Sequence, residues 1–165
     1  MSGRRSREKS SKAVVLDTSY VLPFLGIDVK GVSMDDILDI SRNVELCFPM
    51  VLFAEVCGVM FKQARKQGLD NIPKDAKEGL ESLATGIDVR ILPPTSEDVE
   101  VAYQVIRSGW TDIFDAFAYA SAATRGAILL TLDDSFKRFL KKHGFSHQLL
   151  KSHEELMQLM VGKER

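Results

Sequence analysis

Short apolar runs alternate along the chain with longer segments of helical periodicity. The apolar runs predict buried strands at residues 13–17, 45–49, 87–92 and 127–132, with a short fifth strand around 148–150. The segments between and after them predict helices at residues 20–26, 34–43, 50–66, 73–85, 96–108, 112–125, 135–143 and from 152 onward. This alternation favours an α/β fold, a three-layer α/β/α sandwich around a central parallel sheet of about four to five strands.

Two of the predicted helices have patterns that matter for packing. Nearly every position in the first three turns of helix 50–66 is apolar, so we expect this helix to be packed on most sides. Glu55 is the exception, and its carboxylate would lose hydration there unless it is protonated, paired, bound to a cation or on an exposed edge. In helix 96–108, the expected apolar stripe consists of Val99, Ala102, Tyr103 and Ile106.

The length and composition are those of one domain with a substantial core. Of the 165 residues, 45% are hydrophobic and 27% are charged. We expect residues 13–165 to form a single domain and the basic residues 1–12 to be a disordered tail. The formal net charge of −1 argues against general adhesion to nucleic acid, although it leaves room for a local basic groove.

The sequence favours a cytoplasmic protein with no membrane association. Asp17 and Pro23 interrupt the apolar segment after the basic tail, which is unlike a secretory signal. No apolar run approaches the roughly 18 residues of a membrane span. Cys47 and Cys57 lack C-x-x-C spacing and are expected to be buried thiols in a reducing compartment.

The three histidines make a weak metal-binding set. Gly144 interrupts the helical spacing that would align His143 with His147. We therefore expect His143, His147 and His153 to lie on the surface.

Carboxylates follow two of the predicted strands and begin one of the helices. Asp17 ends the first strand, and Asp133 comes directly after strand 127–132. If these parallel strands are neighbours, the two acids meet at one edge of the sheet. Asp112 and Asp115 begin the helix that precedes strand 127–132, where either acid alone is also explained by helix capping.

Four acids, Asp17, Glu55, Asp115 and Asp133, could therefore share one site. Carboxylates this close would repel each other and be driven toward protonation unless divalent cations neutralised them. Ligand sets made only of oxygen select hard cations such as Mg²⁺ or Mn²⁺. Such a site suits hydrolysis of a phosphodiester bond.

Four segments that contain these acids resemble the PIN-domain nucleases, especially VapC-like toxins, in the family's order and at about its spacings. They are Val15-Leu-Asp17-Thr-Ser19, Ala54-Glu55 in its apolar helix, Phe114-Asp115-Ala-Phe-Ala-Tyr-Ala-Ser-Ala, and Leu130-Thr131-Leu-Asp133-Asp-Ser-Phe136. The chain differs from the family in having Ser19 where Asn is frequent, in lacking Asn or Ser before Glu55, and in its basic tail.

The resemblance implies that Asp17, Glu55, Asp115 and Asp133 bind one or two Mg²⁺ or Mn²⁺ ions and that the chain is a metal-dependent endoribonuclease. Asp112 then becomes a helix cap. Hydroxyls that order the acids, a water or a phosphate oxygen would come from Thr18, Ser19 and Thr131. Family members cleave RNA, usually as homodimers, and the VapC-like toxins among them are inhibited by a partner antitoxin.

Alternatives remain open for the function and for the basic residues. A PIN-like module could bind RNA or a protein without cutting, for example in RNA processing. A dehalogenase-type phosphatase is disfavoured because Ser19 replaces the second acid of its Asp-x-Asp motif. Candidate phosphate contacts, which could equally be a solvated basic surface, are Arg125, Lys137, Arg138, Lys141 and Lys142.

Overall fold

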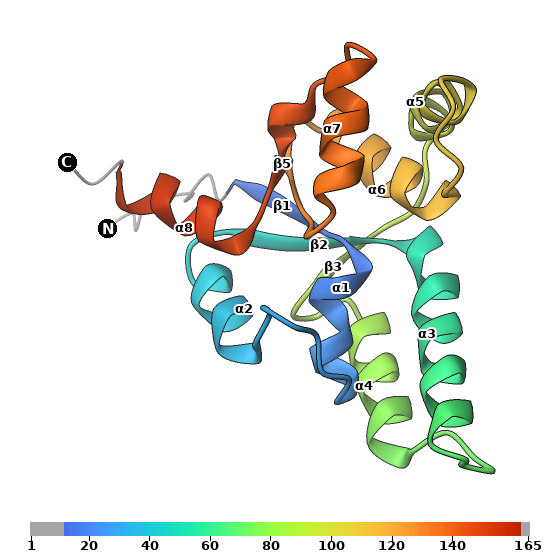
Figure 1. Ribbon diagram of the computed structural model, residues 1–165. Coiled ribbons are helices and arrows are strands. Elements are labelled where there is room, and N and C mark those ends of the chain that lie inside the picture. Colours follow the sequence, from blue (N-terminus) through green and yellow to red (C-terminus); the bar gives the residue numbers. More distant parts are fainter. Residues whose placement is uncertain (1–11, 163–165) are drawn as a thin grey trace, which may run out of the picture.

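A five-stranded parallel sheet forms the centre of the protein, which is described here from a computed structural model covering residues 12–162 (Figure 1). The predicted three-layer α/β/α architecture is confirmed, whereas the predicted tail falls almost entirely outside the described residues. The strand order is β3-β2-β1-β4-β5. The strands are β1 (Ala13–Leu16), β2 (Glu45–Pro49), β3 (Arg90–Leu92), β4 (Ile128–Leu130) and β5 (Leu150–Lys151).

Helices cover both faces of the sheet. In Figure 1, α1, α2 and α4 lie below the sheet, α5, α6 and α7 lie above it, and α8 extends to the left. The α-helices are α1 (Thr18–Val21), α2 (Met34–Ser41), α3 (Phe53–Lys66), α4 (Lys74–Ala84), α5 (Ser96–Arg107), α6 (Ile113–Ala123), α7 (Asp134–Lys142) and α8 (His153–Val161). Single 3₁₀ turns are η1 (Leu22–Leu25), η2 (Met50–Leu52) and η3 (His147–Leu149).

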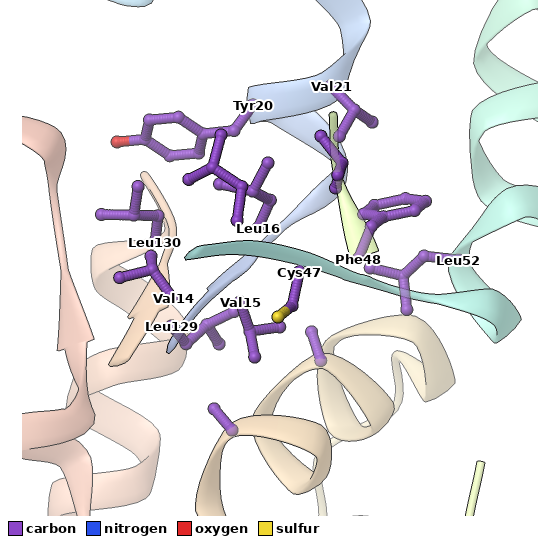
Figure 2. Packing of buried hydrophobic residues seen from close by; sticks show 14 of the residues in the cluster. Val14, Val15, Leu16, Tyr20, Val21, Cys47, Phe48, Leu52, Leu129 and Leu130 are labelled. Carbon is purple, nitrogen blue, oxygen red and sulfur yellow. The ribbon is translucent and has the colours of Figure 1, made fainter. Parts of the chain in front are cut away.

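The central strand β1 is apolar throughout because both of its faces are covered. Val14, Val15 and Leu16 are fully buried. Figure 2 shows Tyr20 and Phe48 on one side of the sheet, with Val15 and Cys47 directed toward the helix on the other. That helix is α6, whose buried face is rich in alanine and contacts β1, β2 and β4. Small side chains let its backbone lie close to the sheet.

Two predicted packing patterns are wrong. Helix α3 is packed on one side only, through Val56, Met60 and Ala64, and the Phe61 side chain is 53% exposed. In α5, Val99 and Tyr103 are largely exposed, so they do not belong to a buried stripe. The buried residues of α5 are Asp98, Ala102 and Val105.

An ion pair explains why α5 buries an acid. The Arg125 guanidinium donates to Asp98 Oδ1 at 2.9 Å and to Oδ2 at 3.2 Å, and Thr124 Oγ1 donates to Oδ1 at 2.6 Å. Burial disfavours the charge on Asp98, but these hydrogen bonds hold the pKa of Asp98 below its usual value. Arg125, one of the candidate phosphate contacts, therefore fastens α5 to the end of α6 through this ion pair.

The prediction of a surface location is also wrong for His153. This residue is 8% exposed, its backbone N–H donates to Tyr20 Oη at 3.0 Å, and its Nδ1 lies 3.1 Å from the same hydroxyl. The contact ties the start of α8 to α1. Cys47 is buried as predicted, Cys57 is only partly buried, and both thiols are free. None of the helices described here is both long and apolar enough to cross a membrane.

Gly79 allows α4 to lie directly against η1. A Cβ atom at position 79 would collide with the backbone carbonyl oxygen of Phe24, whereas one at Gly58 on α3 would meet nothing within 4 Å. We predict that Gly79→Ala lowers the free energy of unfolding by about 1–2 kcal/mol, because the overlap outweighs the gain in helix propensity. Urea denaturation measures the change.

The control is Gly58→Ala, which has the same gain in helix propensity and no overlap. It should raise the free energy of unfolding by about 0.5–1 kcal/mol. Equal effects of the two substitutions would contradict the close α4–η1 contact.

Candidate acidic site

Two strand ends place Asp17 and Asp133 at the same edge of the sheet. Strands β1 and β4 are parallel neighbours with Leu16 opposite Leu130, and Asp17 N–H continues the ladder by donating to Leu130 O at 2.9 Å. Asp17 then caps α1, and Asp133 caps α7 by accepting from Phe136 N–H at 2.8 Å. The predicted meeting of these two acids is confirmed.

Thr131 joins the two strand ends through its hydroxyl group. The buried Oγ1 donates to Asp17 Oδ2 at 2.9 Å and accepts the Asp133 N–H at 3.1 Å. The other oxygen, Asp17 Oδ1, accepts Thr18 N–H at 2.8 Å. Both oxygens of Asp17 are thus oriented, as the sequence led us to expect for Thr131.

Helix α3 brings Glu55 to the same region. After β2, the 3₁₀ turn η2 leads directly into α3, whose first turn contains Glu55. The partly buried Glu55 accepts a hydrogen bond from Thr18 Oγ1 at Oε2, at 2.5 Å. Thr18 therefore contacts Glu55 through its side chain and Asp17 through its backbone. Among the described residues, the Ser19 side chain hydrogen-bonds to none of the four acids.

Helix α6 begins with Asp112 as its N-cap, as predicted, and holds Asp115 in its first turn. Asp112 is exposed and is the N-cap, since its Oδ1 accepts Phe114 N–H at 2.8 Å and Asp115 N–H at 3.3 Å. Asp115, in the first turn, is partly buried and accepts the indole N–H of Trp110 at 2.9 Å. Sequence reasoning missed Trp110, whose only signal was its place just before a helix that begins with two acids.

The four acids lie in each other's electric field. Burial raises the pKa of Asp17 to about 6, and repulsion from Glu55 and Asp133 adds to the increase. Burial raises the pKa of Asp115 to about 7, with further repulsion from Asp17, Asp112 and Asp133. Burial also raises the pKa of Glu55, helped by repulsion from Asp112 and Asp115. A cation placed among these carboxylates would relieve this repulsion.

The donor chemistry fits a hard divalent cation. All candidate ligand atoms are carboxylate or hydroxyl oxygens, which Mg²⁺ and Mn²⁺ prefer. Within residues 12–162, no group of three or more His, Cys, Asp or Glu side chains is already arranged to hold a metal ion. The fit therefore rests on the oxygen-only set and on the mutual repulsion of its members.

A cavity of about 250 Å³ adjoins Asp133 on the side of β5. Its polar lining includes Thr131, Lys137 and Lys151. Lys137 is paired with Glu155 at 3.3 Å, whereas Arg138, Lys141 and Lys142 are exposed along α7. Of the predicted basic contacts, Lys137 is thus the one that lines the cavity next to an acid of the site.

Comparisons with known proteins identify the fold and the family. A family model described as the PIN domain matches residues 14–142. PAE2754 from Pyrobaculum aerophilum has a similar structure, with a TM-score of 0.61 at 15% identity over 98% of this chain and 99% of that one. A comparison with curated proteins gives no match.

Two further similar structures have VapBC names. One is VapBC2 from Rickettsia felis bound to a DNA fragment from their promoter, with a TM-score of 0.55 at 14% identity over 85% of this chain and 98% of that one. The other is VapBC-1 from nontypeable Haemophilus influenzae, with a TM-score of 0.56 at 13% identity over 86% of this chain and 98% of that one. These similarities establish the fold.

The raised pKa values predict that the metal-free protein loses stability as pH rises. Asp17 and Asp115 keep their protons to about pH 6 and 7 when folded but lose them near their ordinary value of 3.8 when unfolded. The folded state therefore binds more protons in this window, and the free energy of unfolding should fall by about 4 kcal/mol between pH 5 and 7.5. Urea denaturation in EDTA across this pH range measures the slope of the unfolding free energy against pH.

Substitution by Asn tests the origin of the slope. Asp17→Asn and Asp115→Asn should each flatten it and leave the protein at least as stable as wild type at pH 7.5, because a repelled charge is removed. A slope that is unchanged in both variants would contradict the assignment.

Proposed function

The chain belongs to the PIN domain family, and from this premise we propose that it is a metal-dependent endoribonuclease that hydrolyses RNA phosphodiester bonds. The observation that supports this most is the Thr131 bridge between Asp17 and Asp133, beside Asp115 and Glu55. It gathers carboxylates where parallel α/β sheets bind ligands.

Asp17, Glu55, Asp115 and Asp133 would hold one or two Mg²⁺ or Mn²⁺ ions. A bound cation of this kind lowers the pKa of water and stabilises negative charge on phosphate oxygens. The chain itself supplies orientation, because Thr131 and Thr18 fix the carboxylates of Asp17 and Glu55.

The attacking water would lie among the four acids, where a held cation would lower its pKa so that its proton passes to solvent. The water oxygen forms a bond to phosphorus as the bond to the 3′ oxygen breaks, and that oxygen leaves with a proton from solvent. This chemistry requires no Ser, Cys or His nucleophile.

The RNA backbone would approach along α7. This helix begins at the Asp133 cap and carries Lys137, Arg138, Lys141 and Lys142. Such contacts position a backbone without reading its sequence.

We also propose that the chain is a toxin inhibited by an antitoxin protein and that it acts as a homodimer in the cytoplasm. Two of the similar structures carry VapBC names, and the sequence resembles VapC-like toxins. Induced expression should then arrest growth in wild type but not in Asp17→Asn. Unaffected growth would favour a role in RNA processing instead.

The second candidate is a PIN module that binds RNA or a protein without cutting. It is favoured by the lack, within residues 12–162, of three acids already arranged to hold a metal ion. Failure of the wild type to bind Mn²⁺ in calorimetry would support this function over the first.

A ribonuclease assay with matched substitutions separates the roles of the acids. In the presence of Mn²⁺, Asp17→Asn and Asp115→Asn should lower the cleavage rate about 100-fold or more, because each removes a charged ligand while keeping the side-chain shape. Cleavage of a labelled single-stranded RNA under saturating substrate measures the rate.

The matched control is Asp112→Asn, which changes an acid three residues from Asp115. Asn is also a good N-cap, so this variant should keep most of the wild-type rate. Equal cleavage by all four proteins would overturn the proposed function.

A further inference from the structure

Trp110 lies between α6 and α7, the helices that begin beside Asp115 and Asp133. It is the sole tryptophan of the chain and lies in the short loop between α5 and α6. Gly109, with φ of +112°, lets the chain turn there, and the backbone N–H of Trp110 donates to Val105 O at 3.4 Å. The partly buried indole is thereby directed back toward α6 and α7 rather than into solvent.

The two sides of the indole contact different elements. Nε1–H donates to Asp115 Oδ2 at 2.9 Å, in the first turn of α6. The ring packs on Phe136 and Phe139 of α7, with centroid distances of 4.9 and 5.0 Å. Because Asp133 is the N-cap of α7, one side chain connects the helices that carry Asp115 and Asp133.

We propose that Trp110 is a positioning residue of the acidic site, which fixes the Asp115 carboxylate through its N–H and the α7 cap through its ring. The inference rests on the proposed function in that the acids bind a divalent cation. Trp110 contacts a candidate ligand and not the cation or the RNA.

Repulsion among the acids explains what the Trp110 indole N–H would do at Asp115. Asp115 faces Asp17, Asp112 and Asp133, so an unrestrained carboxylate would rotate toward solvent, away from the other charges. A donor at Oδ2 opposes that rotation. Within the described residues no hydrogen bond reaches Oδ1, which leaves this oxygen free for a cation.

A purely structural tryptophan would contribute only its ring. Trp110→Phe distinguishes the two roles, since it keeps an aromatic ring against Phe136 and Phe139 but lacks the N–H donor. We expect about tenfold weaker Mn²⁺ binding in calorimetry, the usual effect of losing a hydrogen-bond partner of a metal ligand. Thermal unfolding of the metal-free variant should stay close to that of wild type.

Phe145→Leu is the matched control. It removes the contact of Phe145 with Tyr119, which also packs on Phe136, but leaves the Trp110 indole N–H in place. Its Mn²⁺ affinity should equal that of wild type. Raising the Mn²⁺ concentration should restore RNA cleavage by Trp110→Phe but not by Asp115→Asn.

The tryptophan also provides a direct signal in the wild-type protein. Mn²⁺ should quench its fluorescence with the dissociation constant found by calorimetry, and Asp115→Asn should abolish this quenching. Wild-type affinity in Trp110→Phe, or quenching that persists in Asp115→Asn, would overturn the positioning role alone. A wild type that binds no Mn²⁺ would overturn the proposed function together with this role.

Discussion

The parallel pairing of β1 with β4 is the constraint on which the site depends. Its register places Leu16 beside Leu130, so that Asp17 and Thr131 emerge side by side where the strands end. Side chains alternate between the faces of a strand, and a slip of one residue would therefore direct Asp17 to the opposite face. The buried apolar side chains of both strands oppose such a slip, and the core thereby fixes the position of the charged groups.

Gathering carboxylates destabilises the fold locally, and helix N-termini offset part of this cost. Asp17 and Asp133 are N-caps, while Glu55 and Asp115 lie in the first turns of α3 and α6. Unpaired N–H groups and the helix dipole favour negative charge at these positions. The same acids thus serve both the helices and the site. Because Asn also caps helices, an Asp→Asn substitution removes the charge and keeps the cap, whereas Asp→Ala would remove both.

Contacts far from the acids hold the helices around them. The Asp98–Arg125 pair fixes α5 to the end of α6, and Tyr20 joins α1 to α8 through His153. Trp110 lies between these supports and the acids, since it follows α5 and contacts both α6 and α7. Removing either partner of the Asp98–Arg125 pair would leave an uncompensated charge, so this pair helps to hold α5 against α6.

The sequence by itself determined the strands, the helices, the acids and the Asp112 cap, because apolar periodicity and capping are encoded by residues close together in the chain. It also anticipated the meeting of Asp17 and Asp133, through the rule that parallel strands share a carboxyl edge. It misplaced Val99, Tyr103 and His153, and it did not reveal the Asp98–Arg125 pair. Only the tertiary structure decided those positions and the Trp110–Asp115 contact, because burial of a polar group depends on a partner that another part of the fold supplies.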